Sequence, residues 1–252
     1  MTLDFSPRPA AAPARSRVWA HASIEASLIV RNGEQAILAI LIPLAVLVGA
    51  AFFGDRLGLG LPTAAPSVLA LVMWSSCLTT LAISTGFERR YNVLERIAAT
   101  PLGRPGILAG KALAIGMITL GQVVVLGLAA LALGWRPAFT AASVVVAVAT
   151  ALLCMGAFAG LGLALSGSLR PEATLAVANL LYLVGMPLGI LLPASRFPDW
   201  AARIVQALPT GALGEALRAA STGDALLWPI LVAALWCAAL LTLAWKVFTW
   251  TS

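Results

Sequence analysis

Residues 137–169 read PAFTAASVVVAVATALLCMGAFAGLGLALSGSL, a run of 33 residues without a charged side chain. A helix needs about 20 apolar residues to cross the roughly 30 Å hydrocarbon core of a bilayer. Because this run is free of charge and longer than that minimum, it predicts a membrane-spanning helix over residues 140–166. A chain organised around such a segment folds in a lipid bilayer.

Five further charge-free windows of at least 20 residues lie on either side of this run. They predict helices near residues 35–54, 65–86, 109–133, 172–192 and 226–247. Composition agrees, because 61% of the 252 residues are hydrophobic and only 10% are charged, whereas an ordinary soluble domain has about 25% charged residues. The connecting loops are short. We therefore expect a single all-α integral membrane domain over residues 1–252, with six transmembrane helices in residues 35–252.

The placement of basic residues predicts the orientation of the chain. Six spans put both termini on the same side, and with the termini inside, 11 of the 16 Lys and Arg residues face the cytoplasm. Cytoplasmic loops of membrane proteins carry the excess of basic residues. We therefore expect both termini in the cytoplasm. The net charge is +6, and the basic residues lie between long apolar runs. This distribution favours the membrane surface or a docked protein, and not nucleic acid, as the partner.

The segment before the first span, residues 15–34, reads RSRVWAHASIEASLIVRNGE. Apolar residues recur near helical spacing with charged residues between them, which is typical of a helix lying in the membrane interface. The Asn32-Gly33 pair is a suitable place for it to end. Residues 1–14, rich in Pro and Ala, are expected to form a flexible tail without the apolar core of a cleavable signal. His21 has no evident acidic neighbour, so we interpret it as an interfacial residue.

The densest charge cluster follows the second predicted span and reads FERRYNVLERIAATPLGRPGILAGK, residues 87–111. Its pattern predicts a short amphipathic helix that ends at Thr100-Pro101. On this pattern alone, the segment is either a basic anchor for the cytoplasmic side or a docking surface for a cytoplasmic protein.

On the outer side, residues 193–224 predict two short helices separated at Pro209. They would form a re-entrant segment covered by protein or by a water-filled cavity.

These segments, in this order, resemble the type-2 permeases of ATP-binding-cassette exporters. The stretch ERRYNVLERIAATPLGRPGILAGKALA is similar to that family's cytoplasmic signature, in which LE-x-L-x-x-TPL leads to a GK at the next span. The outer FPDW at residues 197–200, followed by Leu208-Pro209 and Leu217-Arg218, resembles the region before the last span. The chain departs from the family pattern at Tyr91-Asn92, where an acidic residue and a glycine are commoner, and at the GMPLGILLP that ends the fifth span.

The resemblance implies a transmembrane subunit that works with a second permease copy or paralogue and with two ATPase subunits. The chain has no phosphate loop, so ATP and Mg²⁺ would bind to the partner ATPase, and we expect no cofactor or metal here. Residues 88–100 would form the coupling helix, with Arg17 to Asn32 as a connecting helix beside it. Leu208 and Pro209 would border the outer gate. The residues expected to contact the ATPase are Glu88, Arg89, Arg90, Leu94, Glu95, Arg96 and Thr100.

No ionisable residue lies in the middle of a predicted span, although proton relays and ion sites in membranes usually require one. The pathway should therefore be apolar and suited to an amphipathic or hydrophobic compound, such as a drug or antibiotic. The candidate pathway residues are Asn179, Tyr182, Met186, Gln122 and Trp74.

Other functions remain open at this point. Lipid or glycan export is the nearest alternative. A proton-coupled secondary transporter is disfavoured by the missing intramembrane carboxylate, and a purely structural membrane subunit is also compatible with the pattern. An intramembrane enzyme is disfavoured because no catalytic pair or HExxH motif is present. The excess of Arg over Lys, together with abundant Ala, Leu and Gly, indicates a GC-rich bacterial genome. We therefore expect this multi-pass protein in a bacterial plasma membrane.

Overall fold

The computed structural model describes residues 11–250, the side chains of residues 34–36, 38, 55 and 57 excepted, and this part of the chain is built from helices. The first ten residues of the predicted flexible tail lie outside the described residues. Within the described part, the helices long and apolar enough to cross a membrane are Leu61–Arg90, Gly103–Ala132, Ala141–Ser168, Pro171–Ile190 and Trp228–Val247. A shorter apolar stretch covers Ala39–Phe53. The prediction of an all-α membrane protein is confirmed.

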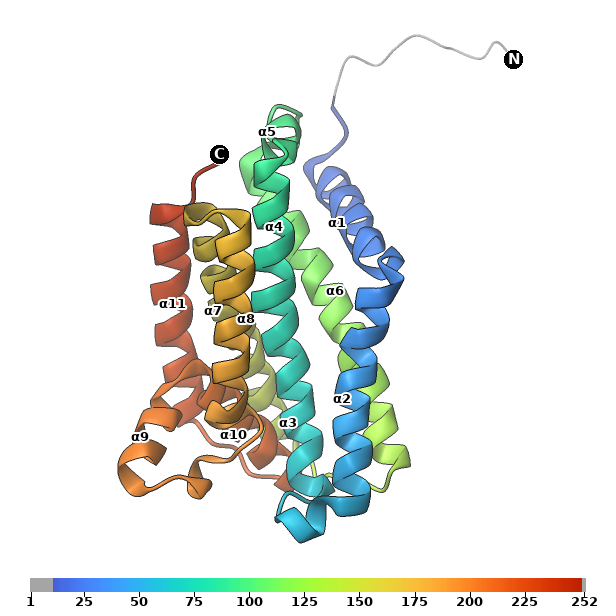
Figure 1. The fold of residues 1–252 in the computed structure, drawn as a ribbon, viewed down its shortest axis with the longest axis vertical. Helices are drawn as coiled ribbons and strands as arrows, with labels where there is room; N and C mark the ends of the chain where they lie inside the picture. Colours follow the sequence, from blue (N-terminus) through green and yellow to red (C-terminus); the bar gives the residue numbers. More distant parts are fainter. Residues whose placement is uncertain (1–10, 251–252) are drawn as a thin grey trace, which may run out of the picture.

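The upright helices form a bundle with different caps at its two ends (Figure 1). In chain order the elements are α1 (Ala14–Arg31), α2 (Gly33–Phe53), η1 (Gly54–Leu57), α3 (Leu61–Trp74), η2 (Ser75–Thr80), α4 (Leu81–Arg90), α5 (Val93–Ala98), α6 (Gly103–Ala132), α7 (Ala141–Ser168), α8 (Pro171–Gly185), η3 (Met186–Ile190), η4 (Ala194–Arg196), α9 (Asp199–Ala207), α10 (Pro209–Thr222) and α11 (Trp228–Val247). The short α5 lies at one end, the α5 end, and α9 and α10 lie at the other, the α9 end.

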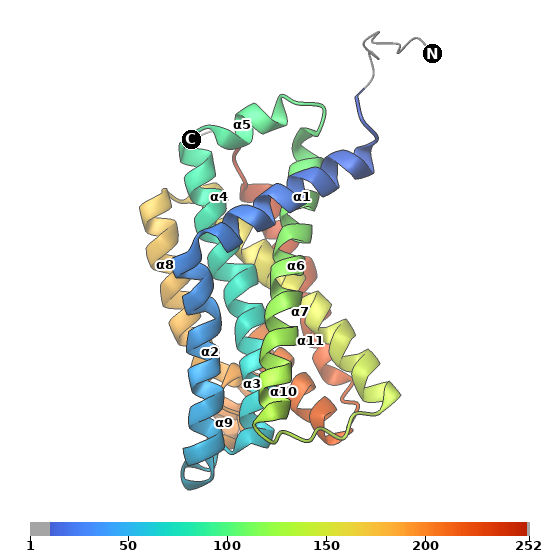
Figure 2. The same cartoon turned by 90° about the vertical axis from the view of Figure 1, so that its right-hand side faces the viewer.

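Helix α1 crosses the bundle obliquely near the α5 end (Figure 2). It stops at Arg31, and α2 begins at Gly33, so the chain turns at the predicted Asn32-Gly33 pair. His21 and Ala22 are buried against the bundle. Other positions around α1 expose large apolar side chains, so hydrophobic residues are not confined to its buried side. These exposed side chains are Trp19, Ile24, Leu28 and Val30.

Helices α7 and α11 pack closely because glycines remove side chains from their contact. A Cβ atom at Gly160 would lie 2.8 Å from the carbonyl carbon of Leu240 in α11, and one at Gly156 would lie 2.8 Å from Sγ of Cys237. Small residues spaced by four allow helix backbones to approach in this way. The Gly156–Gly160 spacing therefore serves packing within this chain.

The fifth predicted span does not continue as a regular helix to residue 192. Helix α8 ends at Gly185, and the backbone leaves helical geometry at Leu188, with ψ of 75°, and at Gly189, with φ of 90°. Pro187, which lacks an N–H, directly precedes this break. The positive φ and the contact of Gly189 with the backbone of Gly211 in α10 both require glycine.

Arg218 of α10 supplies the hydrogen bonds that the broken helix lacks. Its guanidinium donates to the carbonyl oxygens of Gly189 and Ile190, both at 2.8 Å, and to Ser67 Oγ in α3 at 3.0 Å. Glu215, 3.0 Å away, balances its charge. Irregular backbone inside a membrane protein needs such internal partners. The predicted pair of short helices before the last span is confirmed as α9 and α10, which separate at Leu208.

The extent predicted for the coupling helix was wrong. Residues 88–100 do not form one helix, because α4 runs through Arg90 and α5 covers only Val93–Ala98. Between them, Asn92 adopts a left-handed conformation with φ of 57°. Asparagine tolerates this conformation better than most residues, so the turn forms at the position where the sequence departs from the family pattern.

Replacing Gly160 tests the contact between α7 and α11. Gly160→Ala should lower the free energy of unfolding by about 1–3 kcal/mol, because the added methyl group meets backbone atoms that cannot move aside. Gly121→Ala on α6 is the matched control, since a Cβ atom at Gly121 would meet nothing within 4 Å. It should leave stability unchanged or raise it. Thermal denaturation of the purified protein in detergent measures both effects, and equal melting temperatures for the two variants would contradict the packing.

Candidate functional site

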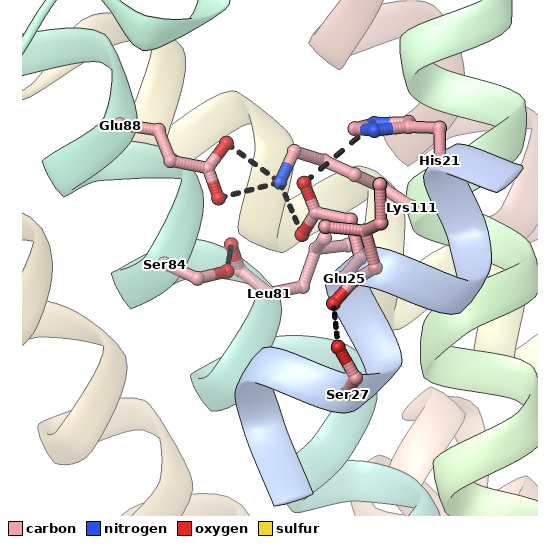
Figure 3. Close-up of polar contacts among 8 residues, drawn as sticks. His21, Glu25, Ser27, Leu81, Ser84, Glu88 and Lys111 are labelled. Atoms are coloured by element: carbon pink, nitrogen blue, oxygen red, sulfur yellow. Dashed lines mark hydrogen bonds and ion pairs between the residues drawn. The ribbon is translucent and has the colours of Figure 1, made fainter. Parts of the chain in front are cut away.

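Lys111 of α6 is 3% exposed and forms ion pairs with carboxylates from two other helices. Its Nζ atom lies 3.1 Å from Oε2 of Glu25 in α1 and 2.7 Å from Oε2 of Glu88 in α4. Figure 3 shows the ammonium group between the two carboxylates, with His21 on the other side of Glu25. We call these four residues the Lys111 cluster. It joins α1, α4 and α6 at a single point near the α5 end.

His21 contributes to the cluster as a neutral ring. Its Nε2 atom lies 3.6 Å from Oε1 of Glu25. Burial lowers the pKa of His21 below its usual value, an effect that Glu25 opposes and that Lys111 reinforces. The imidazole is therefore uncharged at pH 7, and Lys111 is the one cation of the cluster. The ring also contacts Gly110 so closely that a Cβ atom there would collide with it, so α1 rests directly on α6.

The sequence interpretation missed this cluster. The prediction that His21 has no acidic neighbour is wrong, because Glu25 lies one helical turn further along α1. That spacing of four residues was a signal in the sequence. The contributions of Glu88 and Lys111 depend on how three helices pack, which the sequence pattern does not specify.

Arg89 of α4 also points into the protein. It is 8% exposed, and its guanidinium donates to the carbonyl oxygens of Gly167 and Leu169 and, at 2.9 Å, to Thr249 Oγ1. The two carbonyls lie at the C-terminal end of α7, where a cation interacts favourably with the helix dipole. Arg89 thus fixes α4 to the end of α7 and to the segment after α11.

The other residues predicted to contact an ATPase divide by exposure. Leu94 is 1% exposed and anchors α5, whereas Glu95, Arg96 and Thr100 are exposed. Arg90, which is half exposed, pairs with Glu172 of α8. The structure therefore brings Arg90, Glu95, Arg96 and Thr100 to the surface of the α5 end. It places Glu88, Arg89 and Leu94 in contacts within the chain.

Two of the predicted pathway residues connect helices inside the subunit. Trp74 is 4% exposed, and its ring packs edge-on against Phe158 with centroids 4.6 Å apart. Gln122 accepts a 2.8 Å hydrogen bond from Ser76 and donates a 3.5 Å bond to the carbonyl oxygen of Ala39. Gln122 also borders a groove of about 390 Å³ between α6 and the α1–α2 junction.

The other three predicted pathway residues lie on α8 and η3. Asn179 is exposed, while Tyr182 and Met186 are partly buried against the hydrophobic core that contains Trp74 and Phe158. Asn179 belongs to a stripe of exposed side chains over residues 175–184 that is otherwise apolar, after the exposed Glu172 at the start of α8; its large members are Leu175, Leu180, Leu183 and Val184. An asparagine on an apolar outer face is costly in lipid, so this face is suited to contact protein or a cavity.

Leu208 and Pro209, the predicted gate residues, form the connection between α9 and α10. Both are partly buried. The carbonyl oxygen of Pro209 accepts a hydrogen bond from Cys154 Sγ of α7 at 3.4 Å, and that of Ala207 accepts one from Trp236 Nε1 of α11 at 2.8 Å. This connection is therefore held against α7 and α11, two residues before the contact of Gly211 with the broken end of α8.

Removing the cation of the Lys111 cluster tests its structural importance. Lys111→Met leaves two partly buried carboxylates without their cation and should lower the free energy of unfolding by up to about 3–5 kcal/mol. Adding Glu25→Gln and Glu88→Gln to the same chain should restore most of that loss, because the unpaired charges are then absent. Denaturation in detergent and hydrogen exchange in α1 are the measurements.

Arg90→Gln provides the control, because it breaks an ion pair whose partners are 50% and 64% exposed. Exposed pairs contribute about 0–1 kcal/mol, so stability should change little. A Lys111→Met variant as stable as Arg90→Gln, with α1 equally protected, would show that the cluster does not hold α1 in place.

Comparison with known proteins adds to this geometry. A family model described as ABC-2 family transporter protein matches residues 60–246. A search of curated proteins found no match to the chain. The matched range begins just before α3 and reaches the last turn of α11, so it includes α5, α8 and the α9–α10 pair. The family implies an ATP-binding-cassette ATPase as a partner of this membrane subunit. The membrane-length helices show that the chain is a multi-pass membrane protein, and the match shows that it belongs to the ABC-2 family of transporter permeases.

Proposed function

We propose that this chain is the membrane subunit of an ATP-driven exporter in a bacterial plasma membrane. It moves an amphipathic or hydrophobic small molecule, of the kind represented by drugs and antibiotics, out of the cytoplasm or inner leaflet. In this proposal α2 is the sixth span, and both termini and the α5 end face the cytoplasm. The excess of Lys and Arg in the segments assigned to that side supports this orientation.

The main support for the proposal is the way in which α5 is attached to the bundle. Its buried Leu94 attaches the helix to the bundle while Glu95 and Arg96 remain exposed at the end of the molecule. A short helix held in this way can seat in a groove of an ATPase. ATP and Mg²⁺ bind to that partner, and the working assembly contains two ATPase subunits and two permease subunits.

The contacts at the end of α4 connect α5 to other helices of the bundle, so a displacement of α5 can move them. Only the two-residue turn Tyr91-Asn92 separates α5 from α4. At the end of α4, Glu88 binds Lys111 and Arg89 binds the end of α7. Displacement of α5 by a partner therefore acts on α1, α6 and α7 together, which suits a rigid-body switch between inward-open and outward-open states.

We place the substrate pathway beside α8, between this chain and a second copy or paralogue. The exposed stripe around Asn179 offers mostly apolar contact with one polar group, as expected for a site that binds an amphipathic compound. Tyr182 and Met186 flank this stripe. Leu208 and Pro209 border the outer gate in this proposal, close to the broken end of α8. Trp74 and Gln122 support these helices from inside.

Charge reversal on α5 tests the coupling. The double variant Glu95→Arg with Arg96→Glu should reduce both substrate-stimulated ATP hydrolysis and transport by at least about tenfold, because like charges then face the partner's surface. The permease itself should keep its melting temperature, since both side chains are exposed. The assay uses the complex with its ATPase, reconstituted in lipid vesicles.

The matched control reverses two exposed charges at the α9 end, with Asp199→Arg and Arg203→Glu. This variant should retain coupling, because these residues lie on α9, far from α5 in the bundle (Figure 1). Normal hydrolysis and transport by the α5 variant, or an equal loss in both variants, would refute the assignment of α5 as the ATPase contact.

A further inference from the structure

Arg104, at the start of α6, is an exposed cation with no carboxylate within ion-pair distance among the described side chains. Its guanidinium carbon lies 5.2 Å from the centre of the Trp250 ring. Trp250 in turn packs edge-on against Phe248, with ring centroids 5.0 Å apart. The aromatic contact fixes the position of the guanidinium but does not supply an ion-pair partner for its positive charge.

A groove of about 510 Å³ opens beside this pair at the α5 end. It lies between the start of α6, the end of α7 and the last turns of α11. Apart from Arg104, its lining is uncharged and mainly apolar. The residues lining it include Leu108, Leu163, Leu241, Ala244 and Trp245. A molecule that fills this groove must be largely hydrocarbon, with its anionic part at one end.

Arg104 and Trp250 also line a second, smaller cavity of about 330 Å³ under α5, together with Glu95, Ala98 and Ala99. The pair therefore separates an apolar groove from a more polar space. This sequence of environments matches the boundary between the acyl chains and the headgroups of a bilayer. The location matches as well, because both cavities lie where the membrane-length helices α6 and α11 reach the α5 end.

Aromatic and basic residues around the groove also indicate that it lies at the boundary between acyl chains and headgroups. Trp245 is 84% exposed, and tryptophan is enriched where membrane helices meet the interface. Lys246, also exposed, follows it in the last turn of α11. Basic pockets between membrane helices attract anionic lipid headgroups.

We propose that the groove between α6 and α11 binds an anionic glycerophospholipid. One acyl chain lies along Leu108, Leu163 and Leu241, and the phosphate binds the guanidinium of Arg104. The mainly apolar lining favours a lipid over a free phosphate, which would occupy only the Arg104 end. The site lies on α6 and α11 and not on the exposed stripe of α8, so this inference does not depend on the export function proposed above.

Native mass spectrometry of the full-length protein in detergent, titrated with phosphatidylglycerol or phosphatidylcholine, tests this site. The unmodified protein should bind phosphatidylglycerol more tightly than phosphatidylcholine. Arg104→Gln should weaken binding of phosphatidylglycerol about five- to tenfold, the loss expected for one basic contact, and should leave phosphatidylcholine nearly unchanged. Leu163→Trp, which fills the groove, should weaken both lipids. Melting temperatures verify that both variants are folded.

Arg170→Gln is the matched control, because Arg170 is an exposed arginine at the same end, before α8, and borders neither cavity. It should bind phosphatidylglycerol like the unmodified protein. Glycerol 3-phosphate at the same concentration should not displace the lipid. Unchanged phosphatidylglycerol binding in Arg104→Gln, an equal loss in Arg170→Gln, or displacement by glycerol 3-phosphate would each overturn the proposal.

Discussion

The ammonium group of Lys111, placed between the carboxylates of Glu25 and Glu88, is the interaction on which the α5 end depends. Separating the three helices that supply these groups would leave buried charges unpaired, which carries a large cost in free energy. Helix α1 has exposed apolar residues as well, so hydrophobic patterning alone does not specify which side meets the bundle. The ion pairs specify that side.

At the α9 end, a buried cation also connects separate segments of the chain. There Arg218 binds the carbonyl oxygens that the break in α8 leaves free, and Glu215 balances its charge. Both ends of the bundle therefore contain buried cations with defined partners, Lys111 and Arg89 at the α5 end and Arg218 at the α9 end, whereas the middle is held by apolar packing around Trp74 and Phe158.

Much of the helical layout followed from the sequence, because the length of an apolar run limits a membrane helix directly. The predicted helix over residues 140–166 corresponds to Ala141–Ser168. The break at Asn92 was missed because helical periodicity continues across it. Trp74 and Gln122 were predicted to line a pathway because they are polar or aromatic within apolar runs. A single sequence does not show which side of each helix turns inward. Both residues contact neighbouring helices, and their place in a pathway stays a prediction.

The central claim is that energy enters this permease from an ATPase at the α5 end. The most direct measurement is purification of the tagged full-length chain from its native membrane, followed by ATP hydrolysis of the purified material in lipid vesicles with and without amphipathic compounds. The account predicts a stoichiometric complex with an ATP-binding-cassette ATPase whose hydrolysis increases when a transported compound is present. A chain that purifies alone and moves its substrate with a proton gradient, in the absence of ATP, would contradict it.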